Sequence, residues 1–144
     1  MIVVEQRTGI EAGSWGGILS LAAQLRGIAG VVADGPVRDV DEARALDFPI
    51  FARALTARTA RGRVAEAATN VEVRIGEVTV APGDFVLADG SAVVFVRAAD
   101  IAAVLTAAER IAAREAAMAK GLLAGQPAGT VMGAAYEHLL SAGP

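Results

Sequence analysis

Apolar residues recur along the first part of the chain in short runs that glycines and polar turns separate. Residues 2–4 have the pattern of a short strand, and residues 15–26 carry Ile18, Leu21 and Leu25 at helical spacing. Gly27 predicts the end of that helix. The wholly apolar run 29–33 is typical of a buried parallel strand, and we expect a sharp turn over residues 34–39. A short helix over 41–46 and a strand over 48–52 complete a strand and helix alternation.

The middle of the chain changes from helical to alternating periodicity. Residues 56–68 are polar and irregular, and from residue 71 apolar and polar positions alternate, which predicts strands over 71–75, 78–80, 85–87 and 93–96. These short strands indicate a compact β-barrel or β-sandwich beside the βα units. Residues 98–118 carry the longest apolar stripe at helical spacing, and a break over 121–128 precedes a last predicted helix over 130–140. The pattern predicts an α/β fold, and the length predicts one domain over 1–144.

Composition narrows the classes of function. No apolar run approaches the roughly 18 to 20 residues that span a bilayer, and the amino terminus lacks the basic start of a secretory signal, so we expect a cytoplasmic protein without a membrane partner. The chain has no cysteine, which excludes disulfides and thiolate metal sites. A net charge of −3 argues against a nucleic-acid partner. The one histidine, His138, falls in the predicted last helix and receives no catalytic role.

The turn over residues 34–39 carries the candidate chemistry. It follows a buried strand, and ligands of α/β folds bind at the carboxyl ends of such strands. Asp39 could coordinate Mg²⁺ or Mn²⁺, which prefer oxygen ligands, and Arg38 could hold the carboxylate of a small oxo-acid. Alternatively, Asp39 and Asp41 only begin the following helix, where acidic residues are common.

A glycine-rich stretch over residues 13–17 opens the first long helix. Free amides at a helix start bind carboxylate or phosphate groups, and glycines let a ligand approach the backbone closely. The spacing matches neither nucleotide-binding fingerprint, and a plain turn explains the stretch equally well.

These segments together resemble a known family. The runs 15–19, 27–39 and 48–53, followed by 76–84 and 87–90, are similar to the family that contains the regulator of ribonuclease activity A and the class II 4-hydroxy-4-methyl-2-oxoglutarate aldolases. The resemblance covers nearly the whole chain. It implies a swivelling β/β/α fold that resembles phosphohistidine domains, and a homotrimer with sites between subunits.

The resemblance also implies roles for individual residues. Asp39 matches the metal-binding aspartate, and Arg38 matches the arginine that orients the substrate and stabilises its enolate. The helix start matches the part that receives the ligand carboxylate, here Gly16, Gly17, Ile18 and Leu19. The implied cofactor is Mg²⁺ or Mn²⁺, and the implied reaction is aldol cleavage or decarboxylation of a small oxo-acid.

The chain departs from the family pattern in two places. The family places an acid after the glycine of its Trp-Gly pair, where this chain has Gly17, and Glu5, Glu11 or Glu115 of a neighbouring chain could take over that acid's role. Family members also carry helices and a strand before the position of Met1, so we expect an amino-terminally shortened member. Three functions stay open: a metal-dependent lyase, a non-catalytic regulator that binds a partner such as a ribonuclease, and a member recruited to a specialised biosynthetic step.

Overall fold

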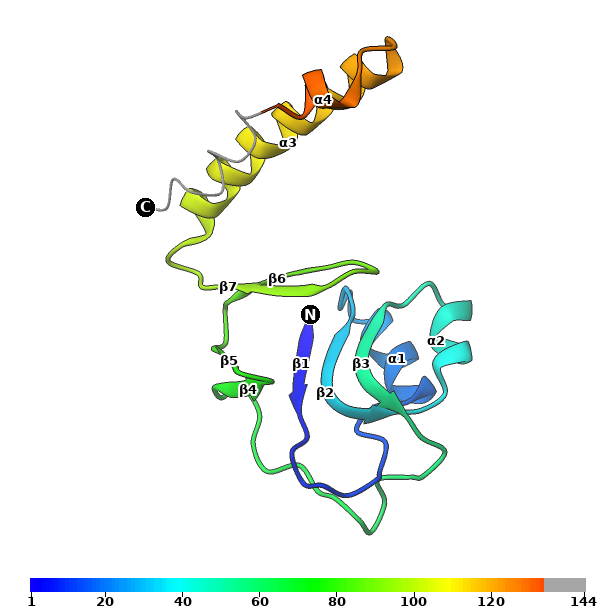
Figure 1. The fold of residues 1–144 in the computed structure, drawn as a ribbon. Coiled ribbons are helices and arrows are strands. Elements are labelled where there is room, and N and C mark those ends of the chain that lie inside the picture. The colour runs from blue at the N-terminus through cyan, green and yellow to red at the C-terminus, as the bar shows by residue number, and fades with distance from the viewer. Residues whose placement is uncertain (134–144) are drawn as a thin grey trace. The chain divides into compact units, whose positions relative to one another are not determined.

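The computed structural model describes residues 1–133, which form two compact units divided after Ala98. The first unit opens with strands and helices in alternation and ends with two hairpins (Figure 1). In chain order its elements are β1 (Ile2–Glu5), α1 (Gly17–Gln24), β2 (Val31–Val37), α2 (Val40–Ala45), β3 (Ile50–Leu55), β4 (Val73–Ile75), β5 (Val78–Val80), β6 (Phe85–Ala88) and β7 (Val93–Val96).

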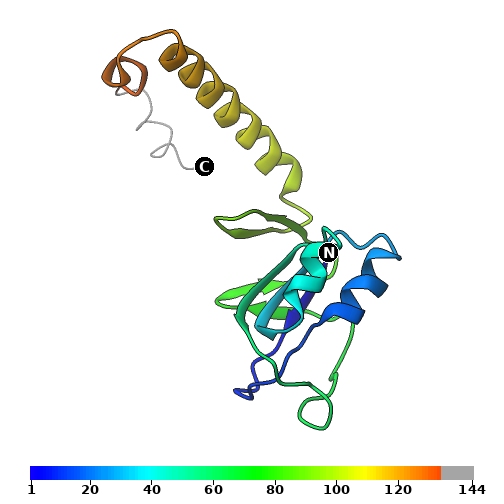
Figure 2. The same cartoon turned by 90° about the vertical axis from the view of Figure 1, so that its right-hand side faces the viewer.

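A parallel three-stranded sheet in the order β1-β2-β3 organises the first unit. The central strand β2 is buried over almost its whole length, as expected for the middle strand of a parallel sheet. Figures 1 and 2 show α1 and α2 on the same side of this sheet. The core on that side joins β2 to both helical segments and consists of Trp15, Ala23, Val31, Ala33, Val37 and Phe48.

Strand β2 is longer than the sequence predicts. Its pairing with β3 shifts register between Ala33 and Pro36, but the strand continues through Asp34 and Gly35 to Val37. The predicted turn at 34–39 is therefore wrong in its first half, and the chain turns only after Val37. Asp34 can stay in the strand because Arg53 forms an ion pair with its buried carboxylate.

The two hairpins are antiparallel, β4 with β5 and β6 with β7, in good agreement with the predicted alternating strands. They form separate two-stranded sheets. The mixed α/β class is thus confirmed, whereas the described residues form no closed β-barrel. The β-sandwich alternative and the likeness to phosphohistidine domains stay predictions. Pairing between hairpins depends on contacts distant in sequence, which periodicity alone does not report.

The second unit begins with α3 (Ile101–Leu123) and continues with α4 (Ala128–Val131). Helix α3 runs past Gly121, where the sequence predicts a break, and ends before Gly125, whose φ is +82°. Across residues 1–133, no helix combines the length and apolar character needed to cross a membrane. Most of the predicted last helix, and His138 with it, lies outside the described residues. The single domain over 1–144 stays a prediction.

Candidate functional site

The start of α1 and the end of β2 are held together by backbone hydrogen bonds. The amide of Ser14 donates to the carbonyl of Pro36 at 2.8 Å, and the amide of Arg38 donates to the carbonyl of Trp15 at 3.0 Å. The Ser14 hydroxyl adds a second hydrogen bond to Pro36 at 3.0 Å. The glycine-rich stretch therefore lies alongside the segment that carries Arg38 and Asp39, although more than twenty residues separate them in sequence.

Arg38 and Asp39 form an ion pair at this junction. Arg38 Nε donates to Asp39 Oδ2 at 2.8 Å, and the Gly17 amide donates to the same oxygen at 3.3 Å. Within residues 1–133, neither Asp39 Oδ1 nor the terminal nitrogens of Arg38 make a hydrogen bond. Both side chains are about one-third exposed, at 38% for Arg38 and 31% for Asp39. The pair therefore offers acceptor and donor atoms that a ligand can reach.

The electrostatics keep Asp39 ionised. The pKa of its carboxyl lies below the ordinary value, chiefly because the Arg38 hydrogen bond favours the charged form. Partial burial opposes this shift, and the amide of Gly17 and the charge of Arg38 support it. A carboxylate ligand of a cation must be deprotonated, so the pair favours the form that binds metal.

The backbone at Asp39 has the left-handed conformation, with φ of 56° and ψ of 36°. Few residues other than glycine adopt this region, but Asp and Asn are enriched there. Asp39 also precedes α2 as its N-cap residue, yet its side chain makes no capping hydrogen bond to that helix. The predicted alternative, that Asp39 only begins a helix, is therefore incomplete, because its carboxylate reaches the start of α1 instead.

Gly16 and Gly17 allow the close approach of the two segments. A Cβ atom at Gly16 would lie 2.9 Å from Asp39 Oδ2 and 3.3 Å from Arg38 Cγ. Gly17 is the first residue of α1, and Ile18 and Leu19 follow in the first turn, where amides lack partners within the helix. The structure thus gathers the predicted site residues in one corner, and their binding and catalytic roles stay predictions.

Glu42 of α2 is the residue that the sequence interpretation missed. A Cβ atom at Gly17 would lie 1.8 Å from Glu42 Oε2 and 2.6 Å from Glu42 Cδ, so the carboxyl group lies directly over Gly17. The sequence feature that could have identified Glu42 is its spacing, because residues three apart at the start of a helix lie near each other and Glu42 follows Asp39 by three positions. Among the carboxylates suggested from sequence, Glu5 accepts a hydrogen bond from the Arg74 amide at 2.7 Å.

The other suggested carboxylate of this unit, Glu11, pairs with the Arg58 guanidinium at 3.3 Å and accepts a hydrogen bond from Thr56. Neither contact of Glu11 involves Arg38 or Asp39. Residues 1–133 contain no cluster of three or more acidic or histidine side chains with metal-ligand spacing.

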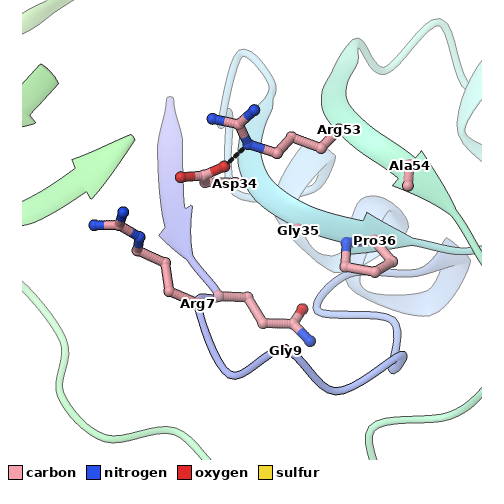
Figure 3. Close-up of a pocket in the computed structure, with 8 residues that line it drawn as sticks. Arg7, Gly9, Asp34, Gly35, Pro36, Arg53 and Ala54 are labelled. Carbon is pink, nitrogen blue, oxygen red and sulfur yellow. Dashed lines mark hydrogen bonds and ion pairs between the residues drawn. The ribbon is translucent and has the colours of Figure 1, made fainter. Parts of the chain in front are cut away.

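A cavity of about 340 Å³ lies further back along β2 (Figure 3). Arg38 and Asp39 do not line it, and its wall consists of Gln6, Arg7, Gly9, Asp34, Gly35, Pro36, Arg53 and Ala54. Its one acidic group, Asp34, is already bound by Arg53 and by the Gly76 amide at 2.8 Å. The Asp34 carboxylate therefore links β2 to β3 and to the β4-β5 turn, and both of its oxygens have protein partners. Asp39 keeps one oxygen without such a partner in residues 1–133, so it is the better candidate for binding a cation.

Comparison with known proteins supplies the family. Residues 1–95 match the family model described as RraA-like, Aldolase/RraA. An uncharacterized protein of Methanocaldococcus jannaschii is 34% identical over 120 residues, which cover 81% of this chain and 55% of that protein. A protein of Halalkalibacterium halodurans described as a putative 4-hydroxy-4-methyl-2-oxoglutarate aldolase is 38% identical over 76 residues, covering 53% of this chain and 35% of its own length.

Solved structures agree with this assignment. The structure of an uncharacterized protein from Pseudomonas syringae superposes with a TM-score of 0.87 at 28% identity, covering 92% of this chain and 66% of the other. The Streptomyces coelicolor protein RraAS2 is described as an unusual member of the RNase ES inhibitor RraA family. Its structure gives a TM-score of 0.67 at 31% identity, covering 75% of this chain and 55% of that one. The match covers 55% of the length of the Methanocaldococcus jannaschii protein and 35% of the Halalkalibacterium halodurans protein, so this chain corresponds to only part of each relative. Its match over residues 1–95 nevertheless places the chain in the RraA-like family.

Proposed function

We propose that the chain is a divalent-metal-dependent lyase, an aldolase or decarboxylase, that acts on a small oxo-acid through an enolate. The observation that carries the proposal is the Arg38–Asp39 pair at the start of α1, with Asp39 Oδ1 and the Arg38 terminal nitrogens left without protein partners in residues 1–133. The relatives described as aldolases support the reaction class.

Each side chain of the corner has a role in this proposal. Asp39 would hold Mg²⁺ or Mn²⁺ through its free oxygen, and the bound cation would supply Lewis-acid stabilisation of the enolate. Arg38 keeps its Nε on Asp39 and directs its terminal nitrogens to the oxo-acid, where they neutralise negative charge that grows as the carbon–carbon bond breaks. This contact is strongest in the transition state, which is why it accelerates the reaction.

The start of α1 would bind the other end of the substrate. The amides of Ile18 and Leu19 are in the first helical turn, and their side chains are 78% and 49% exposed. Unpaired amides at a helix start, together with the helix dipole, favour a carboxylate. With one carboxylate at α1 and the oxo group at Arg38, the substrate has a fixed orientation, which contributes to rate through positioning.

The test is oxaloacetate decarboxylation, followed by pyruvate release with added Mn²⁺ and corrected for the reaction of Mn²⁺ alone. We expect Arg38→Ala and Asp39→Asn each to lower kcat/KM by about 100-fold or more, as loss of an electrostatic group in an active site commonly does. The matched control is Arg44→Ala with Asp41→Asn, a neighbouring exposed ion pair at 2.8 Å. Equal rates in the wild type and in Arg38→Ala would reject the assignment.

A regulator that binds a protein partner is the second candidate. Solved structures of an RNA-processing inhibitor and of a member of a ribonuclease-inhibitor family favour it, and so does the absence of an acid at Gly17. A stable complex with a ribonuclease, combined with no turnover of oxaloacetate, would support this function over the lyase. The homotrimer, the cytoplasmic location and a role in a specialised biosynthetic step stay predictions.

A further inference from the structure

The cavity of Figure 3 lies at the carboxyl end of the parallel sheet and apart from the corner at Arg38 and Asp39. Its volume of about 340 Å³ falls within the range of about 300–1,000 Å³ that is usual for small-molecule sites. Ligands of open α/β sheets bind outside the carboxyl ends of the strands. The lining comes from the segment after β1 (Gln6, Arg7 and Gly9), from β2 (Asp34, Gly35 and Pro36) and from the end of β3 (Arg53 and Ala54).

The sheet is irregular where the cavity lies. The register of β2 against β3 shifts between Ala33 and Pro36, so that Asp34 and Gly35 together lie opposite Arg53 alone. An extra residue of this kind bends a strand and changes the direction of its side chains, and such bulges are frequent beside functional sites. The bulge therefore distinguishes this end of the sheet from a regular pair of strands.

The charges that line the cavity favour an anion. Both oxygens of Asp34 are engaged, one by Arg53 Nε and the other by the Gly76 amide at 2.8 Å. The Arg7 side chain makes no ion pair and no hydrogen bond within residues 1–133. Two arginines and one aspartate leave the lining with one net positive charge, and a ligand with one negative charge would neutralise it.

Arg53 is held in place before any ligand arrives. Its Nε is bonded to Asp34, and a Cβ atom at Gly76 would lie 3.0 Å from Arg53 Nη2, so the guanidinium lies against the β4-β5 turn. Its terminal nitrogens have no hydrogen-bond partner in the part of the chain that the structure describes. Figure 3 shows the Asp34 carboxylate between the guanidinium groups of Arg7 and Arg53. A donor group that is already fixed loses little freedom on binding, and its planar fork matches a carboxylate.

The remaining wall is mostly apolar. Gly9, Gly35, Pro36 and Ala54 present backbone, ring or methyl surface to the cavity and carry no charge. A Cβ atom at Gly9 would meet nothing within 4 Å, so the space beside it is open. An inorganic anion would bond to the arginines and leave this wall uncovered, whereas a short carbon chain would also remove apolar surface from water.

We infer that this cavity is a binding site for a small monocarboxylic acid, whose carboxylate bonds to Arg7 and to the terminal nitrogens of Arg53 and whose carbon chain lies along Pro36 and Ala54. The inference goes beyond the lyase proposal and does not depend on it, because neither Arg38 nor Asp39 lines the cavity. A chain without any turnover of oxaloacetate would still bind an acid here.

The test is a titration of the ¹⁵N-labelled chain with sodium butyrate, followed by the amide signals of each residue. We expect the amides of Gly9, Gly35 and Ala54 to shift together, with one dissociation constant in about the millimolar range. Butyrate has two more methylene groups than acetate, and we expect it to bind at least about 3-fold more tightly, since full burial of one methylene is worth roughly 4-fold. Sodium sulfate at the same ionic strength is the inorganic comparison.

Arg7→Gln removes the exposed charge and leaves the Asp34–Arg53 pair intact. We expect this variant to raise the butyrate dissociation constant by about 5-fold or more, as for the loss of a charged hydrogen bond that solvent screens in part. Arg26→Gln is the matched control, because Arg26 is also exposed but does not line the cavity, and we expect less than about 2-fold. Thermal melting of both variants shows that the fold is retained.

Several results would overturn the inference. Absence of shifts at Gly9, Gly35 and Ala54 would show that the cavity is empty in solution, and equal losses in Arg7→Gln and Arg26→Gln would show a general effect of charge. Sulfate or acetate that binds as tightly as butyrate would refute the assignment to a carboxylic acid with a carbon chain. Arg38→Ala should keep these shifts; their loss in that variant would place the acid at the other corner and leave the lyase proposal standing.

Discussion

Gly16→Ala is a small change that tests the geometry of the whole corner. Gly16 has φ of −162° and ψ of −177°, an extended conformation that alanine also adopts, so the backbone is not strained. The added methyl group would lie 2.9 Å from Asp39 Oδ2, 3.3 Å from Arg38 Cγ and 3.4 Å from Arg38 Nε. Ordinary contacts begin at 3.4 Å, so the Asp39 oxygen has to move by about 0.5 Å.

The expected loss follows from this displacement. A misplacement of about 1 Å can cost roughly 100-fold in rate, so a shift of about half that size predicts a fall in kcat/KM on the order of 10-fold. Stability should change little. Gly16 is the N-cap residue of α1, where alanine is less favourable than glycine by about 0.5–1 kcal/mol, which lowers the melting temperature by a few degrees.

The assay is Mn²⁺-dependent oxaloacetate decarboxylation at low substrate concentration, with thermal melting of the same samples. Gly90→Ala is the matched control, since a Cβ there meets nothing within 4 Å and its φ is not in the left-handed region. We expect the control to keep its rate. A Gly16→Ala protein with the wild-type kcat/KM would refute the reasoning, because the methyl group cannot enter without moving the Arg38–Asp39 pair.

Two further predictions concern stability. Arg53→Ala leaves the buried Asp34 carboxylate with the Gly76 amide as its remaining partner. We therefore expect the free energy of unfolding, measured in urea, to fall by about 1.5–3 kcal/mol. An unchanged midpoint of urea unfolding would contradict the structural role of this ion pair. Asp39 has a pKa below its ordinary value of 3.8 because Arg38 binds the charged form, so its contribution is fully present above pH 3.8 and is lost as the pH falls through the folded-state pKa. The difference in unfolding free energy between the wild type and Asp39→Asn should therefore shrink as the pH is lowered from 3.8, and a difference that is constant with pH would show that the carboxylate is not stabilised by its neighbours.

The sequence predicted most elements because their signals are local. Periodicity located α1, β5 and β7, and Gly27, whose φ is +72°, ends the helical segment as expected. The length of β2 was missed, since the polar residue Asp34 has the character of a turn until Arg53 and Gly76 are seen to pair with it. A residue whose partners are distant in sequence cannot be assigned from its neighbours alone.

The candidate site could be predicted only in part, again because some of its neighbours are distant in sequence. Arg38 and Asp39 are adjacent, so their pairing could be expected, and the resemblance to a family brought in the start of α1. The position of Glu42 could not be expected, because it depends on how closely α2 approaches Gly17 in space. Position 17 was taken as lacking an acid, and the structure shows that an acid from another element fills the space above it.

The left-handed backbone at residue 39 has a consequence for divergence among related chains. Asparagine shares with aspartate the ability to occupy this conformation, so the exchange leaves the turn into α2 unaltered. Codons for the two amino acids differ at a single base, and one point mutation can therefore abolish the anionic group while the surrounding architecture persists. Under the proposed lyase function, this single step would remove the carboxylate that holds the cation and would leave the fold in place.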